Sequence, residues 1–438
     1  MGFSIKKGYI FAFILALLPV IYILIFMNDA VLFSNFSSSM RSLGKILGLV
    51  GIILFSLTFL LNTRLKFTEK LFNGLDNTYK AHHILGTISF LLLLFHPLFL
   101  ASQYITSSFA AVAKFLYPLN ENISVTFGNL GLFLMEIFLI LTFIGKLNYK
   151  TWKFTHRFLG VAFIFASLHV LLISSDVSRN WILRGYITMF LLIGLMSYGY
   201  RSIFRKYFVK VYNYEVKFVK TLGNITEIKL TPKNNFLNFV PGQFVFISFD
   251  SAIGKESHPF TISSSSSDRE LGFSIKNLGD FTGKLKDLKE GSIAKIEGPF
   301  GRFSFVNYPS KNYIFIAGGI GITPFLSMIR SIEDNPDKYY FESIDLHYSI
   351  KTEKEAVFLD ELNEISKKFS EKKLNIFLHI TEKSGYLNLQ KILEKSKNLY
   401  DSKIFICGPV NMMHSLKEQL IYSGIKKDNI KIEEFALL

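Results

Sequence analysis

The sequence predicts a multi-domain protein in which six transmembrane helices precede a soluble half, made of a small antiparallel β-barrel and an α/β domain. Three observations predict this fold class. Half of the 438 residues are apolar, and they concentrate before about position 200. The next part alternates short β-branched runs with charged and glycine-containing turns, as soluble β domains do. The last part alternates strand-like and helix-like runs. We therefore expect domains at 1–205, 206–306 and 307–438.

Charge and cysteine content exclude several classes of function. The net charge is +15 at pH 7, but no basic helix with interleaved aromatic residues accompanies it, so we expect no nucleic acid partner. Cys407 is the one cysteine of the sequence, which excludes an internal disulfide bond and any zinc or iron–sulfur site built from several cysteines. A metal site in this chain must therefore use other ligands.

Six apolar runs are long enough to cross a bilayer, which takes roughly 17 to 25 residues of helix. They lie at about 8–27, 43–61, 82–102, 127–147, 156–174 and 181–200. The first run lacks a small-residue cleavage site, so we interpret it as an anchor and not as a removed signal. Basic residues gather in the segments on one side, at 6–7, 64–80, 146–153 and 201–210. By the positive-inside rule, we expect a multi-pass protein of the plasma (inner) membrane whose N- and C-termini are both cytoplasmic.

Four histidines lie inside two of these apolar runs, where an ionisable ring is costly and usually functional. His82 and His96 lie in the third run, and His156 and His169 lie in the fifth. The first histidine of each pair is followed by Leu-Gly three and four residues later. The 14 residues from His82 to His96 return almost to one helix face, but the 13 from His156 to His169 do not. The fifth span therefore needs a kink, a tightened turn or a bulge to present both rings to one partner.

Two such pairs on parallel spans indicate two haem irons, one above the other, each held by one histidine from each span. His82 would pair with His156, and His96 with His169. A bare metal ion fits less well, because no carboxylate or thiolate lies at similar depth. The alternative is that all four are helix-end histidines bonded to carbonyl groups. His83 does not reproduce the Leu-Gly spacing, and we interpret it as a neighbour of the site.

Arginines near the ends of the spans are candidate partners for haem propionates. Arg41 and Arg179 lie near the outer ends, and Arg64 and Arg157 near the inner ends. Side chains that reach back to the membrane interface explain them equally well.

From about residue 207 the sequence predicts the short strands of a barrel that ends near Gly298-Pro299-Phe300-Gly301. One strand and its turn read His258-Pro259-Phe260-Thr261-Ile262-Ser263, and another strand ends at Lys276 before Gly279-Asp280-Phe281-Thr282. Hydroxyl groups and backbone amides at such turns are what a flavin ring and its pyrophosphate need. By composition alone, ordinary β-domain turns explain these segments as well.

The last part of the chain predicts a nucleotide crevice. A strand over Tyr313–Ala317 runs into Gly318-Gly319-Ile320-Gly321-Ile322-Thr323-Pro324, and a helix follows. Glycines let the backbone approach a pyrophosphate closely, and the helix N-terminus offers free amides. The last strand ends at Cys407-Gly408-Pro409, so we expect the crevice at the carboxyl ends of these strands. Lys351, just past another strand, is either a partner for a 2′-phosphate or a solvated lysine.

Taken together, these motifs resemble the NADPH oxidase/ferric reductase superfamily, and especially its compact bacterial NADPH oxidases, over essentially the whole chain. The marks are the histidine pairs, His258 to Thr261, Gly318 to Pro324, Cys407 to Pro409, and Glu434-Phe435. The resemblance implies a transmembrane haem-binding bundle and a ferredoxin–NADP reductase-like module, in which the barrel binds FAD and the α/β domain binds NAD(P)H. It implies two b-type haems, FAD, and NADPH or NADH as cofactors.

The resemblance also implies roles for single residues. Thr261 of the flavin-contacting motif would lie near the flavin ring, and Thr282 near the FAD pyrophosphate. Gly318, Gly319, Gly321, Thr323 and Pro324 match the nicotinamide-nucleotide loop, and Cys407 would lie beside the nicotinamide. Phe435 matches the terminal aromatic residue that covers the flavin until the nicotinamide displaces it. Ser263, Lys276, Gly408 and Pro409 complete the expected cofactor-binding set.

The activity that the resemblance implies is a superoxide-producing NAD(P)H oxidase, with oxygen as the external acceptor and Arg41 as a candidate to attract superoxide or assist oxygen. Reduction of ferric or cupric chelates is an open alternative, because the scaffold would look nearly identical. Electron delivery to a quinone or to a periplasmic oxidoreductase is a second. Beyond the lipid bilayer, no obligatory protein partner is expected.

Overall fold

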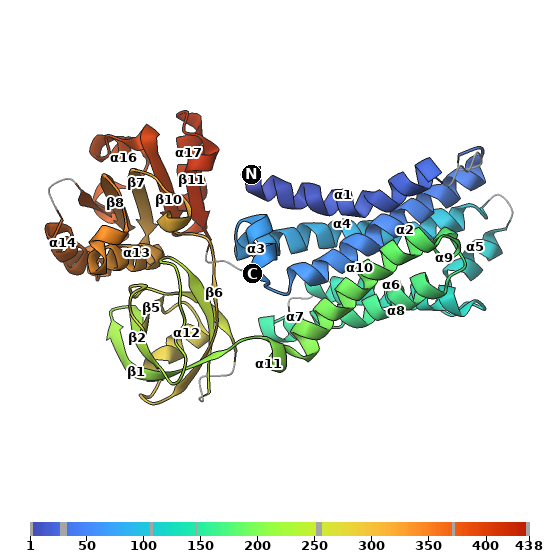
Figure 1. Cartoon of the computed structure of the whole chain (residues 1–438), viewed down its shortest axis with the longest axis horizontal. Helices are drawn as coiled ribbons and strands as arrows, with labels where there is room; N and C mark the ends of the chain where they lie inside the picture. The colour runs from blue at the N-terminus through green and yellow to red at the C-terminus, as the bar shows by residue number, and fades with distance from the viewer. Residues whose placement is uncertain are drawn as a thin grey trace. The chain divides into compact units, whose positions relative to one another are not determined.

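The computed structural model describes residues 3–26, 33–105, 108–144, 147–250, 256–369 and 373–434. The chain forms two compact units, one over Ser4–Phe208 and the other over Val209–Leu438 (Figure 1).

The first unit contains the expected membrane spans. Six helices among the described residues are long and apolar enough to cross a bilayer: Lys7–Phe26, Phe36–Leu61, Leu75–Ser102, Ile123–Phe143, Thr151–Leu172 and Trp181–Ile203. They correspond to α1 (Phe3–Phe26), α2 (Phe36–Leu61), α4 (Leu75–Ser102), α6 (Ile123–Phe143), α7 (Tyr149–His156) with α8 (Leu159–Leu172), and α10 (Trp181–Tyr198) with η1 (Gly199–Ile203). Short helices connect or extend them: α3 (Lys66–Phe72), α5 (Phe109–Leu116), α9 (Asp176–Arg179) and α11 (Arg205–Phe208). The prediction of six spans is confirmed.

Most of these helices begin earlier than their apolar runs, as α2 and α4 illustrate. Helix α2 begins at Phe36, seven residues before the apolar run expected at 43–61. It begins there because the side chain of Asn35 accepts a hydrogen bond from the Ser38 amide and caps the helix. Polar residues also extend the third span, since α4 begins at Leu75, seven residues before His82. Hydropathy marks the membrane-crossing part of a helix, whereas the cap determines where the helix starts.

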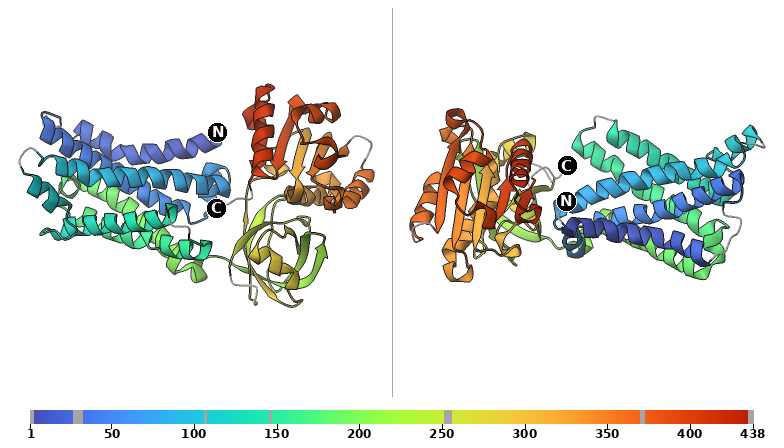
Figure 2. Two further views of the ribbon diagram at one scale, coloured as in Figure 1. Left: turned by 180° about the vertical axis from the view of Figure 1, so that it is seen from behind. Right: turned by 90° about the horizontal axis from the view of Figure 1, so that it is seen from above.

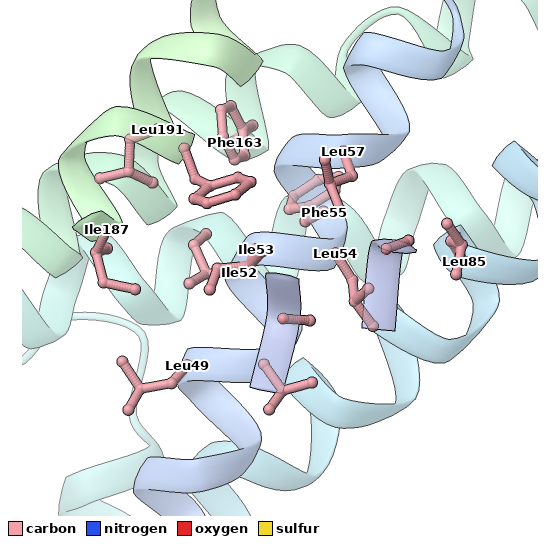
Figure 3. Packing of buried hydrophobic residues seen from close by; sticks show 14 of the residues in the cluster. Leu49, Ile52, Ile53, Leu54, Phe55, Leu57, Leu85, Phe163, Ile187 and Leu191 are labelled. Carbon is pink, nitrogen blue, oxygen red and sulfur yellow. The ribbon is translucent and has the colours of Figure 1, made fainter. Parts of the chain in front are cut away.

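Helix α2 lies at the centre of this unit. In its apolar window 61% of the residues are buried inside the protein, against 17–33% in the other five spans, whose apolar side chains mostly face outward. Figure 3 shows Ile52 and Phe55 of α2 on the side of the helix that lies near Phe163 of α8 and near Ile187 and Leu191 of α10. Phe163 has no exposed surface, and its ring lies 5.2 Å from that of Phe55. The membrane helices run side by side as a bundle, as the two further views show (Figure 2).

The fifth span is interrupted between its two histidines, as their 13-residue spacing predicts. Helix α7 ends at His156, and α8 begins at Leu159. The two intervening residues form tightened turns, in which the amides of Phe158 and Gly160 donate to the carbonyls three residues before, Thr155 and Arg157. The expected local distortion is therefore confirmed, as a short 3₁₀-like break directly after the first histidine.

The second unit begins with a six-stranded antiparallel sheet that curls as a barrel. Its strands are β1 (Tyr212–Leu222), β2 (Ile225–Pro232), β3 (Phe244–Phe249), β4 (His258–Thr261), β5 (Leu271–Lys276) and β6 (Ile293–Phe300), in the order β4-β3-β6-β1-β2-β5. A short helix, α12 (Asp280–Lys284), follows β5. The inward-facing residues form one apolar core, with Tyr214, Phe249 and Phe273 among its largest members.

The α/β part carries a five-stranded parallel sheet in the order β11-β10-β7-β8-β9. The strands are β7 (Asn312–Gly318), β8 (Ser343–Ile350), β9 (Leu374–Ile380), β10 (Ser402–Cys407) and β11 (Ile430–Glu433). Helices α13 (Thr323–Asp334) and α14 (Leu359–Lys367) share one apolar core with the sheet, and α16 (Leu389–Lys395) and α17 (Val410–Tyr422) share another. The sheet therefore has helices on both faces, as the alternating pattern predicts.

Candidate functional sites

The membrane unit brings the four histidines together in the two expected pairs. The ring centroids of His82 and His156 lie 6.1 Å apart, with an angle of 64° between the ring planes. Those of His96 and His169 lie 6.3 Å apart at 68°. His83 is exposed and contacts the ring of Phe143, so it is not a member of either pair.

Hydrogen bonds define the protonation of three of these rings. The Nδ1 atom of His82 lies 2.9 Å from the Thr58 carbonyl oxygen, that of His96 lies 2.7 Å from the Gly44 oxygen, and that of His169 lies 2.7 Å from the Ser124 oxygen. A carbonyl oxygen only accepts, so Nδ1 carries the proton in each of these rings. The lone pair then lies on Nε2, which is the arrangement typical of a metal-binding histidine.

Glycines admit two of the rings against the neighbouring helices. A Cβ atom on Gly48 would lie 2.7 Å from Nδ1 of His96, and one on Gly128 would lie 2.8 Å from Nδ1 of His169. In both cases the glycine stands four residues after the residue whose carbonyl accepts the histidine proton, Gly44 or Ser124. The His96–His169 site is therefore built alike on both sides. One turn of α2 holds the His96 ring of α4, and one turn of α6 holds the His169 ring of α8.

The geometry of both pairs fits a haem held by two imidazoles. Imidazole nitrogen bonds to first-row metals are ~2 Å long, and a ring nitrogen lies ~1 Å from its centroid, so two rings on opposite sides of one iron have centroids ~6 Å apart. Among the described residues, no group of three or more His, Cys, Asp or Glu side chains forms a conventional metal site. Two ligands per site suffice for a haem, because the porphyrin supplies the remaining nitrogens.

The arginines that the sequence analysis singled out lie at the ends of the bundle. Arg41 is exposed on α2, one turn before Gly44. Arg64 donates from Nε to the Tyr79 hydroxyl at 2.6 Å, and Arg157 is exposed in the break between α7 and α8. Lys153 on α7 is within electrostatic range of Arg64, Arg157, Arg201 and Arg205. The end of the bundle near His82 and His156 is therefore strongly positive, whereas a role of any of these arginines at a propionate remains a prediction.

In the barrel, β4 and α12 bring the expected flavin-binding segments side by side. The ring of His258 lies 3.9 Å from that of Phe281, and Phe260 stacks on the same ring at 6.2 Å. The hydroxyl oxygen of Thr282 accepts hydrogen bonds from the amides of Leu278 and Gly279, at 2.9 and 3.0 Å, and so closes the first turn of α12. Thr261 and Lys276 lie half-buried at the ends of β4 and β5. These residues share one region of the barrel, and their contact with FAD stays a prediction.

The serine run that starts at Ser263 joins the barrel to the α/β part. Arg330 of α13 donates from one Nη atom to the Ser263 carbonyl at 2.7 Å and pairs with both carboxylate oxygens of Glu361 at 2.6 and 2.7 Å. The hydroxyl of Ser327 donates to the Ser264 carbonyl at 2.8 Å. The Ser263 hydroxyl lies 3.2 Å from that of Ser274. The run has a structural role that its composition did not reveal.

The position at which the sequence predicts a nucleotide crevice lies between β7 and β10, where the strand order of the parallel sheet reverses. This is the topological switch point at which such sheets bind ligands. The two loops touch: a Cβ atom on Gly321 would lie 2.3 Å from the Cys407 carbonyl oxygen, and one on Gly408 would lie 2.9 Å from the Gly318 Cα. Glycine is needed at both positions because the backbones approach so closely. Thr323 and Pro324 then open α13, and Lys351 is exposed just past the end of β8.

Cys407 is fully buried at the end of β10, beside Glu433 of β11. Burial, and then the neighbouring Glu433 carboxylate, raise the pKa of the Cys407 thiol well above its usual value. Glu433 is absent from the residues predicted for this site, although an acidic residue directly after the last short apolar run is a visible signal. Phe435, two residues later, lies outside the described residues. The roles of Cys407 and Phe435 beside the nicotinamide and the flavin stay predictions.

Three family models match successive parts of the chain. A ferric reductase like transmembrane component matches residues 47–167, an FAD-binding domain matches 208–309, and an oxidoreductase NAD-binding domain matches 315–418. Of the four paired histidines, the first model covers His82, His96 and His156, and it ends two residues before His169. The second contains His258 to Thr282, and the third contains the loops that follow β7 and β10.

Curated relatives match parts of this chain. The glycine betaine monooxygenase reductase subunit of Chromohalobacter salexigens is 29% identical over 215 residues, which cover 45% of this chain and 56% of the relative. A superoxide-generating NADPH oxidase heavy chain of Dictyostelium discoideum is 32% identical over 136 residues, 26% of this chain and 20% of the relative. The probable respiratory burst oxidase homolog protein I of Arabidopsis thaliana is 26% identical over 212 residues, 43% of this chain and 22% of the relative. The chain thus spans about half the length of the first relative and about a fifth of the two oxidases.

The order of the matched domains agrees with the two units of the structure. Six apolar helices with a ferric-reductase-like segment come first, and an antiparallel barrel and a parallel α/β sheet follow. The three domains, together with the oxidase relatives, show that this chain belongs to the NADPH oxidase/ferric reductase superfamily.

Proposed function

We propose that this chain is a membrane NAD(P)H oxidase that moves electrons from a cytosolic nicotinamide nucleotide, by way of FAD and two b-type haems, to oxygen on the other side, giving superoxide. The observation that carries the proposal is the pairing of four membrane histidines at 6.1 and 6.3 Å in a chain that also carries FAD-binding and NAD-binding domains. A protein that only transported a solute would need neither the nucleotide domains nor the histidine pairs.

The protein's own residues hold and orient the cofactors. His82 with His156, and His96 with His169, would hold the two haems, while β4 and α12 would hold the flavin ring and its pyrophosphate. The loops after β7 and β10 would bind the nucleotide, with Cys407 beside the nicotinamide. When bound, FAD accepts a hydride and passes on single electrons, which the two irons carry one at a time. Since both histidines of each pair would hold the haem, the proposal does not require oxygen to bind to iron.

The same proposal includes an orientation in the membrane. The basic segments around Arg64, Lys153 and Arg201 would lie in the cytoplasm, together with the nucleotide-binding half. His82 and His156 would then form the inner site, and His96 and His169 the outer site, close to Arg41. An inside-negative potential would favour outward electron flow by about 2.3 kcal/mol per charge per 100 mV.

Reduction of ferric or cupric chelates is the second candidate. The match of residues 47–167 to a ferric reductase like component favours it, whereas the oxidase relatives favour oxygen. The test is cytochrome c reduction by the purified, haem-loaded chain with FAD and each nucleotide, in the presence and absence of superoxide dismutase. Dismutase-sensitive reduction supports the oxidase; rapid ferric-chelate reduction under argon, with little oxygen consumption in air, supports the reductase.

Two residues test the finer parts of the proposal. If Arg41 assists oxygen, Arg41→Ala lowers superoxide output while chelate reduction is unchanged. If Lys351 binds the 2′-phosphate, Lys351→Ala lowers the preference for NADPH over NADH, and the neighbouring Lys354→Ala serves as its control. Unchanged output or unchanged preference removes the respective role.

A further inference from the structure

One of the four histidines has a different hydrogen-bond partner from the other three. His82, His96 and His169 each donate from Nδ1 to a backbone carbonyl at 2.7–2.9 Å. The Nδ1 atom of His156 instead faces the side-chain hydroxyl of Thr142, at 3.4 Å. Thr142 lies on α6, near the end of that helix, and is half-buried.

The Thr142 hydroxyl is a weak acceptor in this position. Its own proton is donated to the Phe138 carbonyl at 2.7 Å, so the oxygen presents only a lone pair to His156. A hydroxyl oxygen accepts less strongly than a peptide carbonyl, and 3.4 Å is beyond the ~2.7–3.2 Å range of good N–H···O bonds. His156 is therefore the ligand whose Nδ1 proton is pulled least.

The strength of this bond matters because it sets how much electron density the imidazole gives to iron. A strong acceptor at Nδ1 makes the ring more basic and stabilises ferric iron, which lowers the reduction potential. The two sites differ in this respect. The His96–His169 site has two bonds of 2.7 Å to carbonyls, whereas the His82–His156 site has one of 2.9 Å to a carbonyl and one of 3.4 Å to a hydroxyl.

We propose that Thr142 is a positioning residue that keeps the His82–His156 centre at the higher reduction potential of the two, by offering His156 a weak acceptor in place of a carbonyl. The inference rests on the proposed function, because it requires a haem at each pair. With the orientation proposed above, this centre lies on the cytoplasmic side of the membrane, where the electrons would enter. A raised potential there favours the first transfer out of the flavin and leaves the later transfer to be driven by oxygen reduction and the membrane potential.

Other groups around His156 do not supply the missing acceptor. Trp152 stacks on the His156 ring at 5.4 Å and 28°, which makes a packing contact. Arg157 is a donor only, and His82 is the paired ring. Thr142 is thus the described side chain through which the basicity of His156 can be changed without altering a ligand.

The experiment is a spectroelectrochemical titration of the full-length, haem-loaded chain in detergent, with both midpoint potentials followed in the visible haem bands. Three variants grade the acceptor. Thr142→Val keeps the shape and removes the acceptor, Thr142→Ser keeps the hydroxyl, and Thr142→Asn introduces a stronger amide carbonyl. Ser167→Ala is the matched control, because the Ser167 hydroxyl also donates to a carbonyl four residues before, Phe163, at 2.8 Å.

We expect one midpoint to move and the other to remain unchanged. It should shift upward in Thr142→Val, stay at the wild-type value in Thr142→Ser, and shift downward in Thr142→Asn, with neither midpoint moved in Ser167→Ala. The EPR signal of the same centre should shift in the same variants, since ligand basicity changes the splitting of low-spin ferric iron. If either Thr142→Val or Thr142→Asn loses haem, the midpoints of the other variant are compared with those of Thr142→Ser.

Two results would overturn the inference. Midpoints that are the same in all Thr142 variants, or that move together at both centres, would show that Thr142 does not set the potential of one site. Failure of the proposed function looks different: the wild-type protein itself would then lack two low-spin haem centres, and no midpoints would exist to compare.

Discussion

Gly48 provides the sharpest test of the histidine sites, because it touches a ring without being a ligand. A Cβ atom at this position would lie 2.7, 2.8 and 3.2 Å from Nδ1, Cε1 and Cγ of His96. Ordinary Cβ contacts start at about 3.4 Å, so Gly48→Ala forces the ring away by about 0.7 Å. The same nitrogen is held by a 2.7 Å bond to the Gly44 carbonyl, one turn earlier on the same helix. A shift of that size in this direction breaks the bond or tilts the ring.

The expected cost is of two kinds. Overpacking a close contact destabilises a protein by about 1–3 kcal/mol, and weakening a hydrogen bond that orients a metal ligand reduces metal affinity by about 10–100-fold. The His82 ring lies 14 residues before His96 on α4 and bonds to the Thr58 carbonyl, so the His82–His156 site should be unaffected. We therefore expect Gly48→Ala to lose or alter one haem centre, with its partner at His82 and His156 retained.

The assay is haem content per purified chain, together with the low-spin visible and EPR spectra. Gly185→Ala in α10 is the matched control, because a Cβ atom there meets nothing within 4 Å. Gly128→Ala, whose Cβ would lie 2.8 Å from Nδ1 of His169, should reproduce the effect from the other side of the same site. Two unaltered centres in Gly48→Ala and Gly128→Ala would refute the packing of the His96–His169 site described here.

Three further predictions concern the second unit. Arg330→Ala removes the link from α13 to the Ser263 carbonyl and to Glu361. Since Glu361 is 38% exposed, we expect the free energy of unfolding of the FAD-loaded protein to fall by only about 1–2 kcal/mol. Flavin release in urea measures this loss, and Lys367→Ala, at an exposed residue, is a control that should change little. Hydrogen bonds from Lys217, Lys229 and Thr231 lower the pKa of Glu270 from 4.5 to about 2. The charged carboxylate therefore stabilises the fold above about pH 4.5, and this stability is lost as the pH falls toward 2. Glu270→Gln should flatten the acid-unfolding curve between these pH values, and an unchanged curve would count against the network. Because burial raises the pKa of the Cys407 thiol, iodoacetamide should label the native protein at pH 8 far more slowly than the urea-unfolded protein, and equal rates would show that the thiol is accessible and ionised.

The sequence alone determined the parts that depend on local pattern. Six apolar runs predicted six spans, and the alternation of strands and helices predicted a barrel and an α/β sheet, because hydropathy and periodicity act within one helix or strand. The 13-residue spacing of His156 and His169 even predicted a distortion of the fifth span, since a regular helix of that length would point the two rings in different directions. The break at Arg157 and Phe158 meets that requirement.

Only the tertiary structure decided what surrounds each histidine. The carbonyl acceptors of His82, His96 and His169 lie 24, 52 and 45 residues away in the chain, and every residue has a carbonyl, so no local pattern marks Thr58, Gly44 or Ser124. His156 faces a hydroxyl, whereas the other three histidines face a carbonyl, and this difference is visible only in the structure, where α6 packs beside α7. The same holds for the serine run bonded to α13 and for Glu433 beside Cys407. The register between packed helices and strands determines these contacts, and that register comes from the packing of whole faces, which no short stretch of sequence specifies by itself.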